Sequence, residues 1–164
     1  MSSARSMDLI LWRHAEAQVA KEGQPDADRT LTAKGERQAQ RMGGWLNRRL
    51  AESTRVLASP TVRTQQTVRA LGRAFKTVPA LAPEGTVDQL LAAARWPDAG
   101  EPVLVVGHQP TLGLAAAYLL AGVEVDVANP WRMKKGAVWW LRSRQRGEAA
   151  PEITLLAVRS PDLI

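Results

Sequence analysis

The sequence contains no cysteine, which excludes disulfide bonds, a thiolate nucleophile and any cysteine-ligated metal. No apolar run approaches the about 18 residues that a membrane-spanning helix needs, so no membrane partner is expected. Residues 1–7 are mostly small or polar and lack the apolar stretch of a signal peptide. We therefore expect them to form a flexible N-terminal extension, and we expect a cytoplasmic location. Histidine is scarce as well, because the chain has only two.

The composition is that of one folded domain. The chain has 164 residues, of which 45% are hydrophobic, so we expect a single domain over residues 8–164 with a full core. The formal net charge of +6 favours anionic partners such as phosphates, nucleic acids or acidic protein surfaces, although such a charge also serves solubility.

Short apolar runs alternate with helical periodicities along most of the chain. The runs at 9–12, 56–58 and 103–106 are typical of strands that are buried on both faces of a parallel sheet. Further strands are expected at 78–81, 137–141 and 153–158, and helices at about 33–51, 61–75, 87–95 and 111–121. This order predicts an α/β fold, a three-layer α/β/α sandwich with a mostly parallel central sheet.

Polar side chains follow three of the predicted strands at the point where each strand ends. Arg13-His14 follows the first, Ser59-Pro60 the second, with Arg63 one turn into the next helix, and His108 follows the strand at 103–106. Each taken alone has an ordinary interpretation, as a surface ion pair, a solvated helix residue or a strand-end cap. Right-handed crossovers, however, place these strand ends at one edge of the sheet, so the side chains are expected to converge.

Two arginines and two histidines at one sheet edge suit a phosphate pocket. Guanidinium groups match tetrahedral oxyanions and are always charged, and a helix that begins with Ser59 as N-cap and Pro60 in its first turn adds N–H donors. A zinc site is disfavoured, since two histidines are flanked by arginines that repel a cation. A neutral histidine in such a pocket can attack phosphorus, provided that an acceptor such as a backbone carbonyl fixes its tautomer. We therefore expect neither a metal nor a cofactor.

Four segments resemble motifs of one known family, the histidine phosphatase superfamily with its phosphoglycerate mutase-like fold. They follow in family order and are LWRHAE at 11–16, RTLTAKG at 29–35, SPTVRTQQT at 59–67 and VGHQP at 106–110. The short chain and the GHQP form are most similar to the SixA-type phosphohistidine phosphatase branch. The resemblance implies that His14 is the nucleophile, that Arg13, Arg63 and His108 hold the phosphoryl oxygens, and that Arg29 supports the pocket.

A carboxylic acid that protonates the leaving oxygen is a further expectation for a phosphate ester substrate, because an alkoxide leaves poorly. Glu84, in a predicted turn, is the first candidate, although its position also fits a solvated turn glutamate. Asp88 fits a helix N-terminal charge better, and Glu16 could simply pair with an arginine. Protonated phosphohistidine needs no strong acid, since imidazole has a pKa near 6.5.

The substrate is the least determined feature. Only 44 residues separate Arg63 from His108, which indicates an open pocket that could admit a phosphorylated side chain, so we favour protein phosphohistidine over a small phosphomonoester. Other readings stay open: a pseudophosphatase that binds phosphate without turnover, or a nucleic-acid-binding module built on the basic, tryptophan-containing segment 129–146. We regard nucleic acid as the less favoured partner, because a strand at Trp139-Trp140 directs at least one of these rings into the core.

Overall fold

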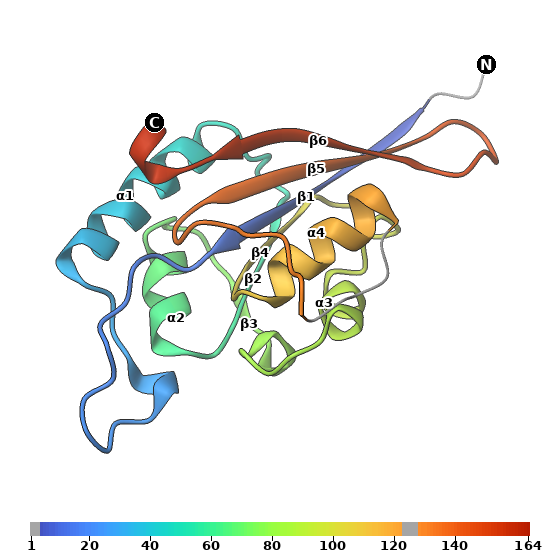
Figure 1. The fold of residues 1–164 in the computed structure, drawn as a ribbon. Helices are drawn as coiled ribbons and strands as arrows, with labels where there is room; N and C mark the ends of the chain where they lie inside the picture. The colour runs from blue at the N-terminus through green and yellow to red at the C-terminus, as the bar shows by residue number, and fades with distance from the viewer. Residues whose placement is uncertain (1–3, 123–127) are drawn as a thin grey trace.

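The computed structural model describes residues 4–122 and 128–164, in which six strands form one sheet in the order β3-β2-β4-β1-β5-β6 (Figure 1). The strands are β1 (Arg5–Arg13), β2 (Arg55–Ala58), β3 (Lys76–Thr77), β4 (Val103–Gly107), β5 (Val138–Gln145) and β6 (Glu152–Arg159). The α-helices of the described residues are α1 (Ala33–Asn47), α2 (Val62–Arg69), α3 (Val87–Ala94) and α4 (Thr111–Ala121). Short 3₁₀ turns follow at η1 (Asp26–Asp28), η2 (Pro79–Leu81) and η3 (Pro161–Leu163).

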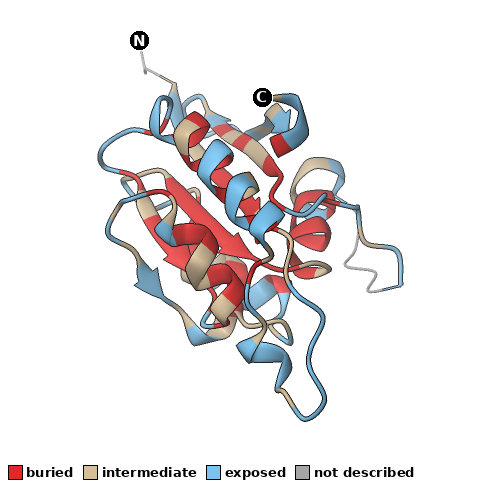
Figure 2. Ribbon diagram, turned by 90° about the vertical axis from the view of Figure 1, so that its left-hand side faces the viewer, coloured by how far each residue is buried: buried red, intermediate tan, exposed pale blue. Residues whose placement is uncertain are grey.

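Alternate residues of β1 pack against two different cores, one on each face of the sheet. Leu9 and Leu11 belong to the core formed with α3 and α4, whereas Ile10 and Trp12 belong to the core formed with α1 and α2. All four are fully buried, as the buried central strands in Figure 2 illustrate. The predicted three-layer α/β/α sandwich is therefore confirmed.

The strand directions place the predicted site at one edge. β3, β2, β4 and β1 pair in parallel, whereas β5 pairs antiparallel with both β1 and β6, so the sheet is mixed with a parallel majority. Arg13 pairs with Gly107, while Ala58 and Trp12 both pair with Val106. The carboxyl ends of β1, β2 and β4 are therefore level, and the residues that follow them meet.

The folded domain begins earlier in the chain than the predicted residue 8. β1 begins at Arg5, whose partner in the antiparallel pairing is Gln145 of β5, so residues 5–7 are strand and not a flexible extension. The reason is that β5 extends beyond the predicted 137–141 and provides hydrogen-bonding partners for a longer first strand. Residues 1–3 of the predicted extension lie outside the described residues.

Two further elements differ from the prediction. The strand expected at 78–81 is a 3₁₀ turn, because Pro79 lacks an N–H for a ladder and its ring fixes φ. The paired residues are instead Lys76 and Thr77. α2 ends at Arg69 and not near residue 75, since the chain soon turns at Gly72 with a φ of +71°.

Glycines allow α1 to approach its neighbours closely. Thr32 caps the helix by accepting a hydrogen bond from the Gly35 N–H (2.9 Å), as the sequence predicted. A Cβ on Gly35 would lie 2.0 Å from the Glu16 carbonyl oxygen, and one on Gly43 would lie 2.8 Å from the Ala70 carbonyl oxygen. The RTLTAKG motif therefore packs the start of α1 against the segment that follows His14.

Candidate active site

His14 is held at the end of β1 in a single tautomer. Its backbone N–H donates to the Gly107 carbonyl (3.1 Å), which continues the pairing with β4. Its ring Nδ1 lies 2.7 Å from the Ala15 carbonyl oxygen, and a carbonyl only accepts, so Nδ1 carries the proton. Nε2 therefore keeps its lone pair. The side chain is buried, so little water competes for that atom.

His108 stands opposite His14 at the end of β4. The two ring centroids are 5.3 Å apart. His108 Nε2 lies 2.7 Å from Ser59 Oγ, and Nδ1 lies 3.5 Å from Arg63 Nη2. Because a guanidinium only donates, Nδ1 is the acceptor and the Nε2–H donates to Ser59. The first residue after β2 thus orients the second histidine.

This contact corrects the role predicted for Ser59. The N-cap of α2 is Thr61, and its side chain makes no capping hydrogen bond, so neither Ser59 nor Pro60 begins the helix. The N-cap lies two residues later than predicted, and the Ser59 hydroxyl contacts His108 instead. The Thr61 hydroxyl lies 2.7 Å from the hydroxyl of Thr64. The SP motif therefore positions an imidazole.

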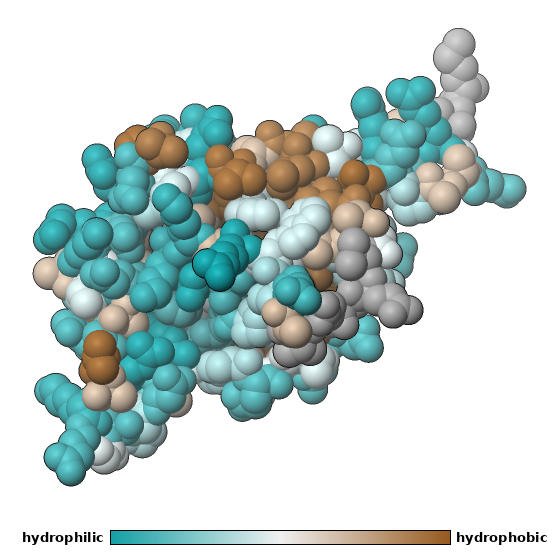
Figure 3. All heavy atoms as spheres, in the orientation of Figure 1, coloured by the Kyte–Doolittle hydropathy of each residue, from teal (hydrophilic) through white to brown (hydrophobic). Residues whose placement is uncertain are grey.

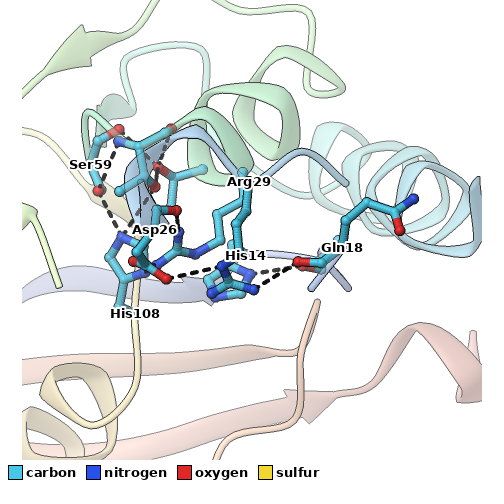
Figure 4. A network of polar contacts seen from close by, with 10 residues as sticks. His14, Gln18, Asp26, Arg29, Ser59 and His108 are labelled. Carbon is cyan, nitrogen blue, oxygen red and sulfur yellow. Dashed lines mark hydrogen bonds and ion pairs between the residues drawn. The ribbon is translucent and has the colours of Figure 1, made fainter. Parts of the chain in front are cut away.

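Arg63 is held by a residue that the sequence analysis did not single out. Its Nη2 donates to Asp26 Oδ2 (3.0 Å) and its Nη1 to the Asp26 carbonyl (2.9 Å). Asp26 Oδ1 in turn accepts from Arg29 Nε (2.9 Å), and Arg29 Nη1 donates to the Gln18 carbonyl (3.0 Å) (Figure 4). Asp26 lies in a polar loop, where the only signal was its position three residues before Arg29.

Arg13 approaches from the end of β1. Its Nη1 donates to the Met133 carbonyl (2.7 Å), which fixes one side of the guanidinium. Among the described residues, the buried Nε atoms of Arg13 and Arg63 have no hydrogen-bond partner. Both groups therefore retain N–H donors, and a buried donor without a partner is costly unless a ligand satisfies it.

The surroundings keep both imidazoles neutral. Burial and, to a smaller extent, the positive charges of Arg63, Arg13 and Arg29 lower the pKa of His14 to about 4, against the opposing effect of the hydrogen bond to Ala15. Burial, together with the proximity of His14 and Arg63, lowers the pKa of His108 to about 3. At neutral pH, His14 Nε2 is thus an unprotonated nitrogen beside fixed cations.

The three carboxylates considered as acids occupy different places. Glu84 is exposed and lines a cavity of about 340 Å³ together with Asp26 and Thr61, so it stands at the rim of the site. Glu16 accepts a hydrogen bond from the Thr32 hydroxyl (2.7 Å), and not from an arginine. Asp88 lies in the first turn of α3, as its helix N-terminal interpretation predicted.

The aromatic residues of segment 129–146 serve packing. Trp139 is packed against one core and Trp140 against the other. Trp140 Nε1 donates to Asp8 Oδ2 (3.0 Å), and Arg142 forms an ion pair with the same carboxylate. Trp131, which is 37% exposed, lies against Trp139 with ring centroids 6.2 Å apart. The segment thus offers no row of outward rings for stacking bases.

Within residues 4–122 and 128–164, no three His, Cys, Asp or Glu side chains come close enough together to hold a metal ion. None of the helices in this part of the chain is long and apolar enough to cross a membrane.

Comparisons with known proteins agree with this geometry. Residues 9–84 match the family model described as "Histidine phosphatase superfamily (branch 1)". The chain is 32% identical to the phosphohistidine phosphatase SixA of Escherichia coli over 124 residues, covering 71% of this chain and 76% of that protein. It is also 32% identical to an uncharacterised protein of Picosynechococcus over 163 residues, covering 94% and 97%. A solved structure of the protein histidine phosphatase SixA complexed with tungstate is 27% identical, with a TM-score of 0.76 and coverage of 95% and 98%.

Proposed function

This chain belongs to the histidine phosphatase superfamily and is a phosphatase, and we propose that it hydrolyses protein phosphohistidine through a covalent phosphohistidine intermediate on His14. The observation that carries the proposal is the hydrogen bond between His14 Nδ1 and the Ala15 carbonyl, which leaves Nε2 free beside two arginines. The tungstate in the related structure is a tetrahedral oxyanion and supports an oxyanion pocket.

In the first half of the reaction, His14 Nε2 attacks the phosphorus atom. An N–P bond forms as the bond from phosphorus to the leaving group breaks, and the leaving group takes the electron pair. Arg13 and Arg63 stabilise the charge on the transferring oxygens, the electrostatic contribution that dominates phosphoryl transfer. The incoming dianion favours protonation of His108, whose Nδ1 then also donates to a phosphoryl oxygen. No metal is needed in this scheme.

In the second half, water attacks the phosphorus atom of the intermediate. The N–P bond to His14 breaks, its electron pair returns to Nε2, and phosphate leaves with the oxygen and protons of the water. The Nδ1–H bond to Ala15 is kept throughout, so the same tautomer is restored. His14 Nε2 is thus the nucleophile of the first transfer and the leaving group of the second.

The charge state of Asp26, the carboxyl group bonded to Arg63, favours a phosphoramidate substrate. Partial burial raises the pKa of Asp26, but the hydrogen bonds from Arg63 and Arg29 outweigh this effect and lower it, so Asp26 is a carboxylate and no proton donor. Protonated phosphohistidine leaves as neutral imidazole without such a donor. The printed name of the Escherichia coli relative, a phosphohistidine phosphatase, supports the same substrate class.

A small phosphomonoester is the second candidate, and one observation favours it. Glu84 shares the rim cavity with Asp26, where its carboxyl group could protonate an ester oxygen. In that case Glu84→Gln lowers turnover of esters, whereas turnover of phosphohistidine is unaffected.

The proposal is tested by comparing the wild-type protein with His14→Ala on p-nitrophenyl phosphate and on a phosphohistidine peptide, both in EDTA. We expect the wild type to turn over both substrates in EDTA and His14→Ala to lose at least about 10³-fold in kcat, since a nucleophile is removed. Equal rates in the two proteins would contradict the mechanism, and loss of wild-type activity in EDTA would indicate a metal.

A further inference from the structure

A cationic groove of about 730 Å³ runs between α1 and α2, outside the active site. Arg37 and Arg41 of α1 and Arg69 of α2 line it, and all three are exposed. None of them forms an ion pair within the described residues; Arg41 Nη1 only donates to the Pro161 carbonyl (3.4 Å). Glu36 is the single acidic residue of the lining, so the lining residues carry a net positive charge. Figure 3 shows the hydrophilic surface over α1.

The floor of this groove is apolar and aliphatic. Leu31 and Ala39 are buried beneath it, and Ala70 packs against them in a small core that also includes Ala15. No aromatic residue belongs to the lining, so the groove has no ring on which a nucleobase could stack. Exposed cations over an aliphatic floor fit a peptide that carries acidic and aliphatic side chains.

The groove is adjacent to the active site, because both use α2 and the segment that follows His14. Gln66, which lines the groove one turn after Arg63 on α2, accepts from the Leu31 N–H (2.7 Å). Thr67, the next residue, accepts from the Ala15 N–H (3.1 Å), directly after His14. The groove floor and the segment that follows His14 therefore belong to one packed unit, so the groove lies next to the end of β1.

We propose that this groove docks an acidic segment of the phosphoprotein substrate, an inference that rests on the proposed function. The exposed arginines attract the segment over a distance of about a Debye length and orient the substrate protein, whereas the buried pocket performs the chemistry. The proposal therefore assigns substrate selection to charges that take no part in phosphoryl transfer.

The test uses two synthetic phosphohistidine peptides that differ only in one arm, six glutamates against six glutamines. In the variant Arg37→Gln/Arg41→Gln/Arg69→Gln, we expect KM for the glutamate-arm peptide to rise about tenfold, since each exposed pair contributes little. We expect kcat for the glutamate-arm peptide to change less than about twofold, because the pocket is intact. For the same reason, kcat and KM for the glutamine-arm peptide and for p-nitrophenyl phosphate should change less than about twofold.

A matched control removes the same charge elsewhere. Arg5, Arg144 and Arg146 are exposed at the opposite end of the sheet, where the β5–β6 hairpin lies, so their change to Gln alters net charge but not the groove (Figure 1). An equal rise in KM in both triple variants, or equal KM of the two peptides in the wild type, overturns the proposal.

Direct binding separates this proposal from the proposed function. Fluorescence anisotropy of the unphosphorylated glutamate-arm peptide, labelled and titrated with His14→Ala protein, needs no turnover. If the peptide binds and the substitutions Arg37→Gln/Arg41→Gln/Arg69→Gln abolish this binding, docking is supported even if no phosphohistidine peptide is hydrolysed. Absence of binding in this assay overturns docking even if hydrolysis occurs. A single-stranded oligonucleotide that displaces the peptide at a lower concentration assigns the groove to nucleic acid instead.

Discussion

Two sets of three arginines lie on neighbouring parts of this molecule and differ in how they are held. The pocket arginines are Arg13, Arg29 and Arg63, and the groove arginines are Arg37, Arg41 and Arg69. Each pocket arginine donates to a backbone carbonyl, and the Arg63 side chain is 4% exposed and bound to Asp26. The groove arginines are exposed and form no ion pair in the part of the chain that the structure describes.

The difference shows how the same side chain supports two tasks. Fixed cations in a buried pocket need no reorganisation when charge develops on a phosphoryl group, so they lower the barrier of the reaction. Exposed cations are screened by salt and lose rotamer freedom on binding, so they contribute mainly to association. Burial lowers the pKa of Arg13 and of Arg63, yet both remain charged at neutral pH, because a guanidinium starts far above it.

The largest expected effect comes from exchanging single arginines of α2. Arg63→Gln removes a fixed cation from the pocket, and we expect kcat/KM for p-nitrophenyl phosphate to fall about 10²–10³-fold. Arg69→Gln, on the same helix, serves as the matched control and is expected to stay within about twofold. Steady-state kinetics of the two variants, with circular dichroism to verify folding, measure the contrast. Similar losses in both would remove the distinction between pocket and groove.

A smaller effect is expected at the carboxylate that holds the pocket. Asp26→Asn keeps the shape of the side chain but removes the charge that binds Arg63 and Arg29, so we expect kcat/KM to fall about tenfold. Asp28→Asn, in the same 3₁₀ turn and exposed, is the control. An increase in kcat/KM for Asp26→Asn would show instead that Asp26 competes with the phosphoryl group for Arg63.

The smallest expected effect is that of pH on kcat/KM between pH 5 and 8. His14 must be neutral to attack, and its lowered pKa of about 4 means that the neutral form persists well below the usual range of histidine. We therefore expect kcat/KM, corrected for ionisation of the substrate, to be flat over this range as far as His14 is concerned and to fall as pH drops through about 4. An inflection near 6.5 would show that His14 is solvated like a surface histidine.

Much of the pocket could be predicted from the sequence because its residues directly follow buried strands. Once the runs at 9–12 and 103–106 were identified as parallel strands, the positions of His14 and His108 at one edge followed from the handedness of the crossovers. The three-layer fold could be predicted for the same reason, since the order of strands and helices leaves few alternatives.

The contacts between loops could not be predicted in this way. Asp26 reaches Arg63 across 37 positions of sequence, from a polar loop without periodicity. Ser59 fitted an N-cap equally well, and only the fold shows that its hydroxyl meets His108. The early start of β1 at Arg5 depended on the length of β5, a feature distant in sequence. Periodicity describes local structure, and these contacts are set by tertiary packing.

The most direct test of the account is to trap the covalent intermediate. Wild-type protein mixed with a phosphohistidine peptide, quenched in base within milliseconds and digested, should yield a peptide that carries one phosphoryl group on His14 by tandem mass spectrometry. His14→Ala protein treated in the same way should yield none. A phosphoryl group on His108, or turnover without any phosphorylated peptide at times when the intermediate should accumulate, would contradict the assignment of His14 as nucleophile.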